Sequence, residues 1–226
     1  MTHKSALVGL VLMACSTNES VDQTVPVVAT APQHLPFFDS PEFTPRWLEP
    51  TEVPTGFHQI PEHAMTDQHG AEVTEAAMTG KVTVVDFFFA SCRGICPRLA
   101  QSMQTIDEAF PSDAPVLLLS YSVMPEHDTV DVLATYAQTR GVTSPRWHFL
   151  TGDRAQIYSL GRTAYFVEES MGIERDDDEF LHTENVVLID QNRRIRGIYN
   201  GVTDASVRQL ITDAQTLLAE ADSSVR

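Results

Sequence analysis

The sequence predicts an α/β fold in which helices flank a central mixed sheet, with short peripheral strands before it. Two observations lead to this prediction. Between residues 82 and 161, apolar and β-branched runs alternate with segments of helical period, the pattern of parallel strands joined by crossover helices. The last part of the chain instead reads as two strands joined by a short turn and followed by a helix, so part of the sheet must be antiparallel. With 226 residues, 42% of them apolar, the chain can bury a core of ordinary size.

The first predicted strands are short and peripheral. Leu35–Asp39 and Phe43–Trp47 flank a Ser-Pro turn, and we expect a small hairpin there. Phe57–Ile60 and Glu72–Thr74 are two further strand candidates, on either side of an Asp-Gln-His-Gly turn. These segments are the predicted N-terminal peripheral strands.

The main sheet begins with Val82–Phe89. This run, VTVVDFFF, is almost continuously apolar, as is typical of a strand buried on both faces. Ile95–Phe110 follows with apolar residues at Leu99, Met103 and Ile106, a helical period. The two segments therefore predict a buried strand that leads directly into a helix.

The remaining elements repeat this alternation and then change it. In order, they are a strand at Val116–Tyr121, a helix at Asp128–Arg140, a strand at Trp147–Leu150, a helix at Asp153–Gly161, a hairpin of Asn185–Asp190 with Ile195–Tyr199, and a helix from Asp204 to about Glu220. A parallel β-α-β unit followed by a hairpin and a closing helix is the order of a thioredoxin-like fold.

The N-terminus has the layout of an export signal. Residues 1–14 combine a short polar start with an apolar run too short to span a bilayer. The sequence LMAC that ends at Cys15 resembles a bacterial lipobox, so we expect lipidation of Cys15; the alternative is an ordinary cleaved signal with an incidental cysteine. Residues 15–34 are polar and aperiodic and read as a lipid-anchored tether to a domain at 35–226.

This organisation predicts a lipoprotein of the bacterial cell envelope whose domain faces the periplasm or the exterior. The choice between inner and outer membrane stays open. The formal net charge of −16 disfavours nucleic acid and anionic lipid as partners. We therefore expect membrane contact only through the N-terminal lipid.

Cys92 and Cys96 stand where the first buried strand passes into its helix. If Cys15 is lipidated, they are the only free thiols in the chain. Unpaired backbone N–H groups and the helix dipole favour thiolate at a helix N-terminus, so we expect both cysteines to have a lowered pKa. Three interpretations of the CxxxC spacing stay open: a redox-active pair, a structural disulfide, or a soft-metal site.

His182 is the histidine best placed to join the two cysteines. It comes just before the predicted strand Asn185–Asp190, and in a thioredoxin-like sheet the loop entering that strand lies beside the N-terminus of the first helix. Two thiolates and one imidazole suit Cu(I) or Cu(II), whereas structural zinc requires a fourth ligand.

Five motifs together resemble the Sco/SenC copper-chaperone family, over residues 57–218. They are VVDFFFASCRGICP, YSVMPEHDTVDVLATYA, WHFLTG, FLHTENVVLID and YNGVTD. The resemblance implies a thioredoxin-like fold that binds one copper ion, Cu(I) or Cu(II), through Cys92, Cys96 and His182. It also implies a role in assembling the dinuclear copper centre of cytochrome c oxidase subunit II, or of a related copper enzyme, with a second periplasmic copper chaperone as a possible further partner.

The resemblance leaves a second function open. A thiol–disulfide reductase that keeps partner cysteines reduced for metallation would use Cys92 and Cys96 as its redox-active pair. Against this, the segment Leu181–Thr183 lacks the proline that reductases of this fold carry in the corresponding loop.

Three positions require separate comment. Met124 stands where the family commonly has Asp, and Arg93 where Pro often follows the first cysteine. Asp86 lies within the apolar strand, and we expect a buried, hydrogen-bonded carboxylate there rather than a catalytic one.

Overall fold

The structure of the chain is a computed structural model that describes residues 34–167 and 183–224. Four predictions fall outside the described residues: the signal peptide at 1–14, lipidation of Cys15, the tether up to residue 33, and the position of His182. None of the described helices combines the length and the apolar composition needed to cross a bilayer.

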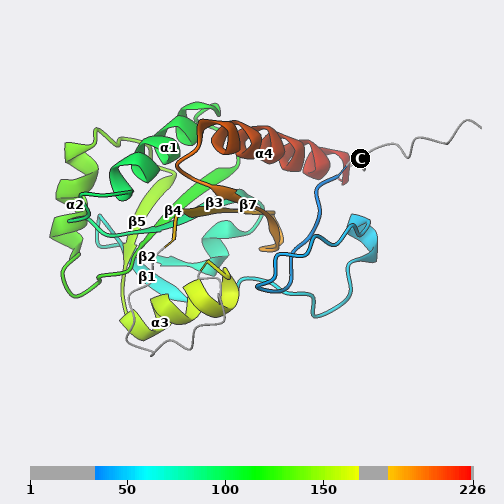
Figure 1. Cartoon of the computed structure of the whole chain (residues 1–226), viewed down its shortest axis with the longest axis horizontal. Helices are drawn as coiled ribbons and strands as arrows, with labels where there is room; N and C mark the ends of the chain where they lie inside the picture. The colour runs from blue at the N-terminus through cyan, green and yellow to red at the C-terminus, as the bar shows by residue number, and fades with distance from the viewer. Residues whose placement is uncertain (1–33, 168–182, 225–226) are drawn as a thin grey trace, which may run out of the picture. The chain divides into compact units, whose positions relative to one another are not determined.

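The core of the fold is a seven-stranded mixed sheet (Figure 1). Across the sheet, the strands are β2 (Glu72–Thr74), β1 (Ala64–Asp67), β5 (Trp147–Thr151), β4 (Val116–Ser122), β3 (Val82–Phe88), β6 (Asn185–Ile189) and β7 (Ile195–Asn200). The pairs β3–β4 and β4–β5 are parallel and all other pairs are antiparallel. The predicted mixed sheet and thioredoxin-like order are confirmed.

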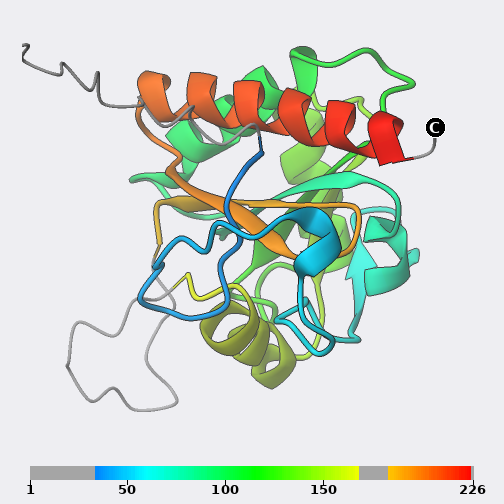
Figure 2. The same cartoon turned by 90° about the vertical axis from the view of Figure 1, so that its right-hand side faces the viewer.

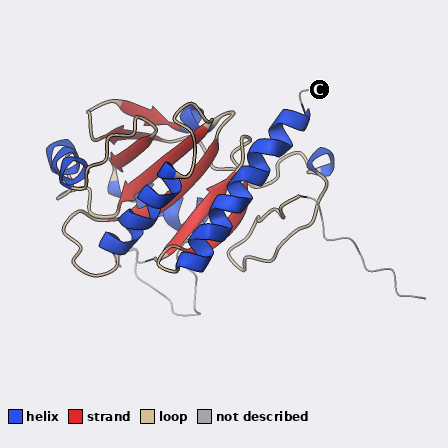
Figure 3. Cartoon of the chain, turned by 90° about the horizontal axis from the view of Figure 1, so that it is seen from above, coloured by secondary structure: helices blue, strands red, loops and turns tan. Residues whose placement is uncertain are grey.

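Helices cover both faces of the sheet. They are α1 (Cys96–Glu108), α2 (Val130–Thr139), α3 (Arg154–Ser159) and α4 (Asp204–Ser224), with 3-10 turns η1 (Pro50–Glu52) and η2 (Glu75–Met78) and a π-helical turn η3 (Leu160–Ala164). Seen from above, α1 and α4 lie side by side across one face (Figure 3). The helix α3 lies below the other face (Figure 1).

Alternation along β3 divides the core into two apolar clusters, because successive side chains of a strand point to opposite faces. Val84 and Phe88 pack with α1, α2 and α4, whereas Val85 and Phe87 pack with α3 and η3. All seven residues of β3 are buried. The apolar run therefore serves both faces, as predicted for a central strand.

The N-terminal peripheral strands are the weakest part of the prediction. The expected hairpin is reduced to one antiparallel bridge, Phe37 with Arg46, and Phe38 instead bridges to Ile195 on the β7 edge. Figure 2 shows this first described segment, in blue, running from α4 along β7.

The strand predicted at Phe57–Ile60 is wrong, whereas the strand at Glu72–Thr74 is confirmed as β2. The partner of β2 is β1, whose alternating burial starts at Met65. Ile60 is fully buried, but it reaches the core from an extended segment that bonds to Arg193. Burial of that segment, rather than strand pairing, explains its apolar residues.

Candidate functional site

Cys92 and Cys96 lie where β3 passes into α1, as the sequence predicts. Residues 89–95 form a loop, here called the thiol loop, in which the N–H of Cys92 donates to the carbonyl of Phe89 (3.2 Å). Cys96 is the first residue of α1 and is only 4% exposed, whereas Cys92 is half-buried. No disulfide joins the two sulfurs in this structure.

The two cysteines differ in their acidity. Burial acts to raise the pKa of Cys92, but hydrogen bonds from the Cys96 thiol and from the backbone N–H groups of residues 94–96 together outweigh it, and the pKa is lowered. Burial raises the pKa of Cys96 to about 12, and the hydrogen bond with Cys92 and the nearby charges of Cys92 and Asp86 add to the increase.

The expectation of two acidic thiols is therefore wrong for Cys96. The helix N-terminus favours thiolate, but the Cys96 sulfur is buried among apolar residues and is hydrogen-bonded to the Cys92 sulfur. The arrangement provides one thiol with a lowered pKa near the surface and one buried thiol with a raised pKa beneath it.

A buried carboxylate holds the start of the thiol loop. Oδ2 of Asp128 accepts hydrogen bonds from the N–H of Ala90 (2.9 Å) and from Oγ of Ser122 (2.6 Å). Asp128 is 2% exposed, and Ser122 also accepts from the N–H of Met124 (3.1 Å). Sequence reasoning missed both residues as parts of the site; the signal was two small polar residues inside the motif YSVMPEHDTV, directly after a buried strand.

Asp86 is buried and hydrogen-bonded, as expected. Ser120 donates to its carboxylate (2.5 Å) and in turn accepts from Nε1 of Trp147 (2.9 Å). Burial raises the pKa of Asp86 to about 7. The residue lies under the same face of the sheet as Cys96, whose pKa its charge helps to raise.

No further metal ligand joins the two cysteines within residues 34–167 and 183–224, where no group of three or more His, Cys, Asp or Glu side chains could hold an ion. His63 contacts Tyr121 Oη (2.9 Å) and His148 contacts Asp67 (3.0 Å), so both imidazoles have partners elsewhere. Met124 packs against the apolar cluster on the other face of the sheet from the cysteines.

Comparison with known proteins identifies the family. The SCO1/SenC family model matches residues 53–219, which include the whole sheet and the thiol loop. The chain belongs to the SCO1/SenC family. Its resemblance to the Sco proteins, first indicated by five motifs, is thereby confirmed.

The relatives of this SCO1/SenC chain include bacterial and mitochondrial proteins. It is 24% identical over 163 residues to the SCO1 protein homolog of Bacillus subtilis, a match that covers 70% of this chain and 82% of that protein. It is 31% identical over 129 residues to the mitochondrial SCO2 homolog of Bos taurus, covering 55% of this chain but 47% of that protein. The chain therefore spans less than half the length of this mitochondrial relative.

Solved structures share the fold. A SCO1/SenC family lipoprotein from Bacillus anthracis matches with a TM-score of 0.61 and 24% identity, over 71% of this chain and 95% of that one. BsSco, a Sco cytochrome c oxidase assembly protein described as having a disulfide switch, matches with a TM-score of 0.60 and 22% identity, over 72% and 94%. ScoI of Bradyrhizobium japonicum, solved with copper bound, matches with a TM-score of 0.55 and 26% identity, over 70% and 98%.

Proposed function

We propose that this chain is a copper-binding metallochaperone that helps to assemble the copper centre of cytochrome c oxidase subunit II. One copper ion, Cu(I) or Cu(II), would be held by Cys92, Cys96 and His182 as cargo rather than as a resident cofactor. The observation that carries the proposal is the pair of free, hydrogen-bonded thiols at the start of α1. Relatives that share this fold are described as oxidase assembly proteins or are solved with copper bound.

The geometry suggests an order of binding. Cys92, with its lowered pKa and partial exposure, would supply the first thiolate. Cys96 would follow with loss of its proton, because a thiol must be deprotonated to ligate copper. Uptake of copper should therefore release protons to the solvent.

The support for His182 is the pairing of β3 with β6. The two strands are antiparallel, with Val85 opposite Val187, so the start of β6 lies toward the end of β3 that leads into the thiol loop. At the start of β6, Oγ1 of Thr183 accepts a hydrogen bond from the N–H of Asn185 (2.9 Å). His182 directly precedes Thr183 in the chain.

Titration of the reduced, metal-free protein with copper tests the proposal. We expect one ion per chain and a thiolate-to-Cu(II) charge-transfer band, both lost in the double variant Cys92→Ser/Cys96→Ser. His182→Ala should weaken Cu(II) binding sharply, whereas His69→Ala, at an exposed turn, should not. Stoichiometric binding with an unchanged band in the double variant would refute the assignment.

A thiol–disulfide reductase is the second candidate, and the unequal acidity of the cysteines is the observation that favours it. The Cys92 thiolate would attack a partner disulfide and release one partner thiolate; Cys96 would then attack the Cys92 sulfur, release the second, and leave a Cys92–Cys96 disulfide. Partner-peptide reduction by the metal-free protein, at a rate insensitive to His182→Ala, would favour this function over copper delivery.

We further propose that the chain is an envelope lipoprotein, with a signal peptide at 1–14, lipidation at Cys15, a tether to residue 34 and the Sco domain at 35–226. The support is the lipobox-like sequence and the description of the Bacillus anthracis relative as a lipoprotein. Cys15→Ser should move the protein from the membrane fraction to the soluble fraction. Equal membrane retention of both forms would contradict the lipid anchor.

A further inference from the structure

A groove opens between α1 and α2 and begins at the thiol loop. Its volume is about 700 Å³, and its first lining residues are Ala90 and Ser91, next to Cys92. The buried side chains of Tyr136 and Trp147 contribute to its wall. A smaller cavity of about 350 Å³ shares Trp147 with the groove and extends the groove past the end of α2. The volume of the larger groove is typical of a site that binds a ligand.

Exposed apolar side chains occur both in the thiol loop and in the groove. Among the described residues, only three large hydrophobic side chains are exposed: Trp47, Ile95 (37%) and Val132 (39%). Ile95 belongs to the thiol loop and Val132 lines the groove. A single exposed apolar side chain is ordinary, but one of these three lies beside Cys96 in the chain and a second lines the groove, as expected of a surface that contacts another protein.

The groove lacks the excess of acidic side chains that the chain as a whole carries. The net charge is −16, yet the only acidic side chain in the lining is Asp128, which is buried and bonded to Ala90 and Ser122. Glu108 lies in the adjoining smaller cavity, where it accepts from the amide of Gln104 (2.9 Å). The main groove therefore presents no free carboxylate of its own.

Arg140 supplies a cation without an ionic partner. Its guanidinium lies over the ring of Tyr136, 4.5 Å from the ring centre, and within the described residues no carboxylate pairs with it. By contrast, Arg98 and Arg146 each pair with an aspartate. A carboxylate brought into the groove would find a cation already positioned on an aromatic ring.

We infer that this groove docks a segment of the protein that exchanges copper with the thiol loop. The segment carries apolar side chains, which cover Val132, and at least one carboxylate, which pairs with Arg140. Docking there places the partner's own copper ligands beside Cys92, because the groove starts one residue before that cysteine. The inference rests on the proposed copper-transfer function, but the binding of the segment is testable without copper.

The test uses two synthetic peptides as probes. The acidic peptide is acetyl-Leu-Asp-Glu-Leu-Asp-Glu-amide, and the neutral control replaces Asp by Asn and Glu by Gln. Each is titrated into the reduced, metal-free, isotope-labelled chain carrying Cys15→Ser, and amide chemical shifts are followed by NMR. We expect saturable changes for the acidic peptide along the groove, at Ala100, Gln104, Thr135 and Arg140, and about tenfold weaker binding of the neutral peptide.

Matched variants separate the groove from general charge attraction. Arg140→Gln should reduce the affinity for the acidic peptide to that for the neutral one, whereas Arg98→Gln, which removes the same charge from an exposed site on α1, should leave the preference intact. Val132→Asp should abolish binding of both peptides. Shifts spread over the surface, equal affinity for both peptides, or equal effects of the two arginine variants would overturn the inference.

Copper measurements keep the two proposals apart. If the wild-type chain binds no copper, the proposed function fails while the peptide titration still decides whether the groove binds acidic segments. If the chain binds copper, excess acidic peptide should slow copper transfer to the soluble domain of an oxidase subunit II without changing copper affinity. Unchanged transfer at saturating peptide would overturn the docking role.

Discussion

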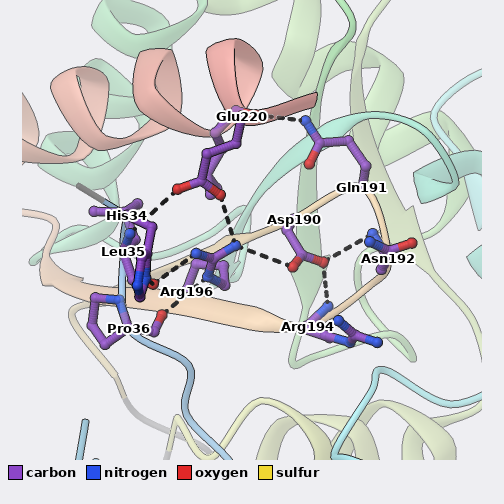
Figure 4. A network of polar contacts seen from close by, with 10 residues as sticks. His34, Leu35, Pro36, Asp190, Gln191, Asn192, Arg194, Arg196 and Glu220 are labelled. Atoms are coloured by element: carbon purple, nitrogen blue, oxygen red, sulfur yellow. Dashed lines mark hydrogen bonds and ion pairs between the residues drawn. The ribbon is translucent and has the colours of Figure 1, made fainter. Parts of the chain in front are cut away.

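The two ends of α4 lie against regions that differ in how completely their polar groups are bonded. Asp204, its first residue, pairs with Arg98 in the first turn of α1, next to the two free thiols. Glu220 lies 16 residues further on, about 24 Å along the helix at 1.5 Å per residue, and joins a buried network around Arg196 (Figure 4).

The network around Arg196 leaves little bonding capacity unused. The side chain is 3% exposed, and its guanidinium lies 4.0 Å from the centre of the Phe37 ring. Its polar partners are the carbonyls of Leu35 (2.7 Å) and Pro36 (3.0 Å) and the carboxylates of Asp190 (3.4 Å) and Glu220 (3.2 Å). The guanidinium thus ties the first described segment to β7 and α4.

The network around Arg196 and the thiol loop should therefore serve different purposes, the first stability and the second binding. A buried charge with several partners contributes little to ligand binding, but removing it leaves its partners uncompensated. The thiol loop instead keeps the half-buried sulfur of Cys92 and the exposed side chain of Ile95 available. Variants at the two ends should therefore change different properties of the protein.

The largest expected effect is that of Arg196→Met. It leaves the carboxylates of Asp190 and Glu220 without their cation, which should cost about 3–5 kcal/mol in the free energy of unfolding. Chemical denaturation measures this cost, and copper titration of the folded variant should give wild-type affinity. The matched control, Arg98→Met, breaks an exposed ion pair and should cost less than about 1 kcal/mol. If Arg196→Met and Arg98→Met lower the free energy of unfolding equally, the two ends of α4 do not differ in the way described.

Asp86 should make the free energy of unfolding depend on pH. Its pKa is about 7 in the folded protein, against 3.8 for a fully solvated aspartate, so between these values the folded chain holds a proton that the unfolded chain has lost. The contribution is therefore fully present below about pH 4 and is lost as pH rises to about 7, with a slope of up to about 1.4 kcal/mol per pH unit.

Asp86→Asn should flatten this dependence, as denaturation at a series of pH values would show. The control is Asp113→Asn at an exposed position, which should keep the wild-type slope. An unchanged slope in the Asp86 variant would mean that another group causes the pH dependence.

A smaller effect is expected from Asp128→Ala. The change leaves the N–H of Ala90 and the hydroxyl of Ser122 without their acceptor, at a cost of about 1–3 kcal/mol. Unlike Arg196→Met, it should also weaken copper binding, because it frees the start of the thiol loop. Asp128→Asn, which retains one acceptor oxygen, should restore part of both losses. If Asp128→Ala lowers stability but keeps full copper affinity, the hydrogen bonds of Asp128 do not position the cysteines.

The sequence predicted the central elements well because their signals are local. The apolar run of β3, the helical period of α1 and the turn between β6 and β7 each depend on neighbouring residues, and each element lies within a few residues of its predicted bounds. The strand at Phe57–Ile60 failed because the apolar residues of that segment are buried by distant elements, including the contact of Ile60 with Arg193.

The candidate site shows the same limit. The positions of Cys92 and Cys96 at the strand–helix junction followed from their spacing and flanking periods, and this was sufficient to predict a lowered pKa for Cys92. The raised pKa of Cys96 could not be predicted, because it depends on burial and on the orientation of one sulfur toward another. Asp128 was missed for a similar reason: its contact with Ala90 joins residues 38 positions apart.

The smallest expected effect concerns the hydrogen bond between the two sulfurs. In the reduced, metal-free protein, Cys96→Ala removes the thiol that donates to Cys92, while the backbone N–H groups of the loop remain, so the pKa of Cys92 should rise but stay sensitive to the helix N-terminus. Because only the thiolate reacts, the rate of iodoacetamide modification should fall several-fold near pH 7, and its pH profile should move to higher pH. The reciprocal variant, Cys92→Ala, should lower the pKa of Cys96 from about 12, since it removes both the hydrogen bond and the neighbouring charge, yet burial should keep that thiol slow to react. If Cys96→Ala leaves the profile of Cys92 in place, the backbone N–H groups alone set the acidity of Cys92, and the two residues would act as independent cysteines rather than as a pair.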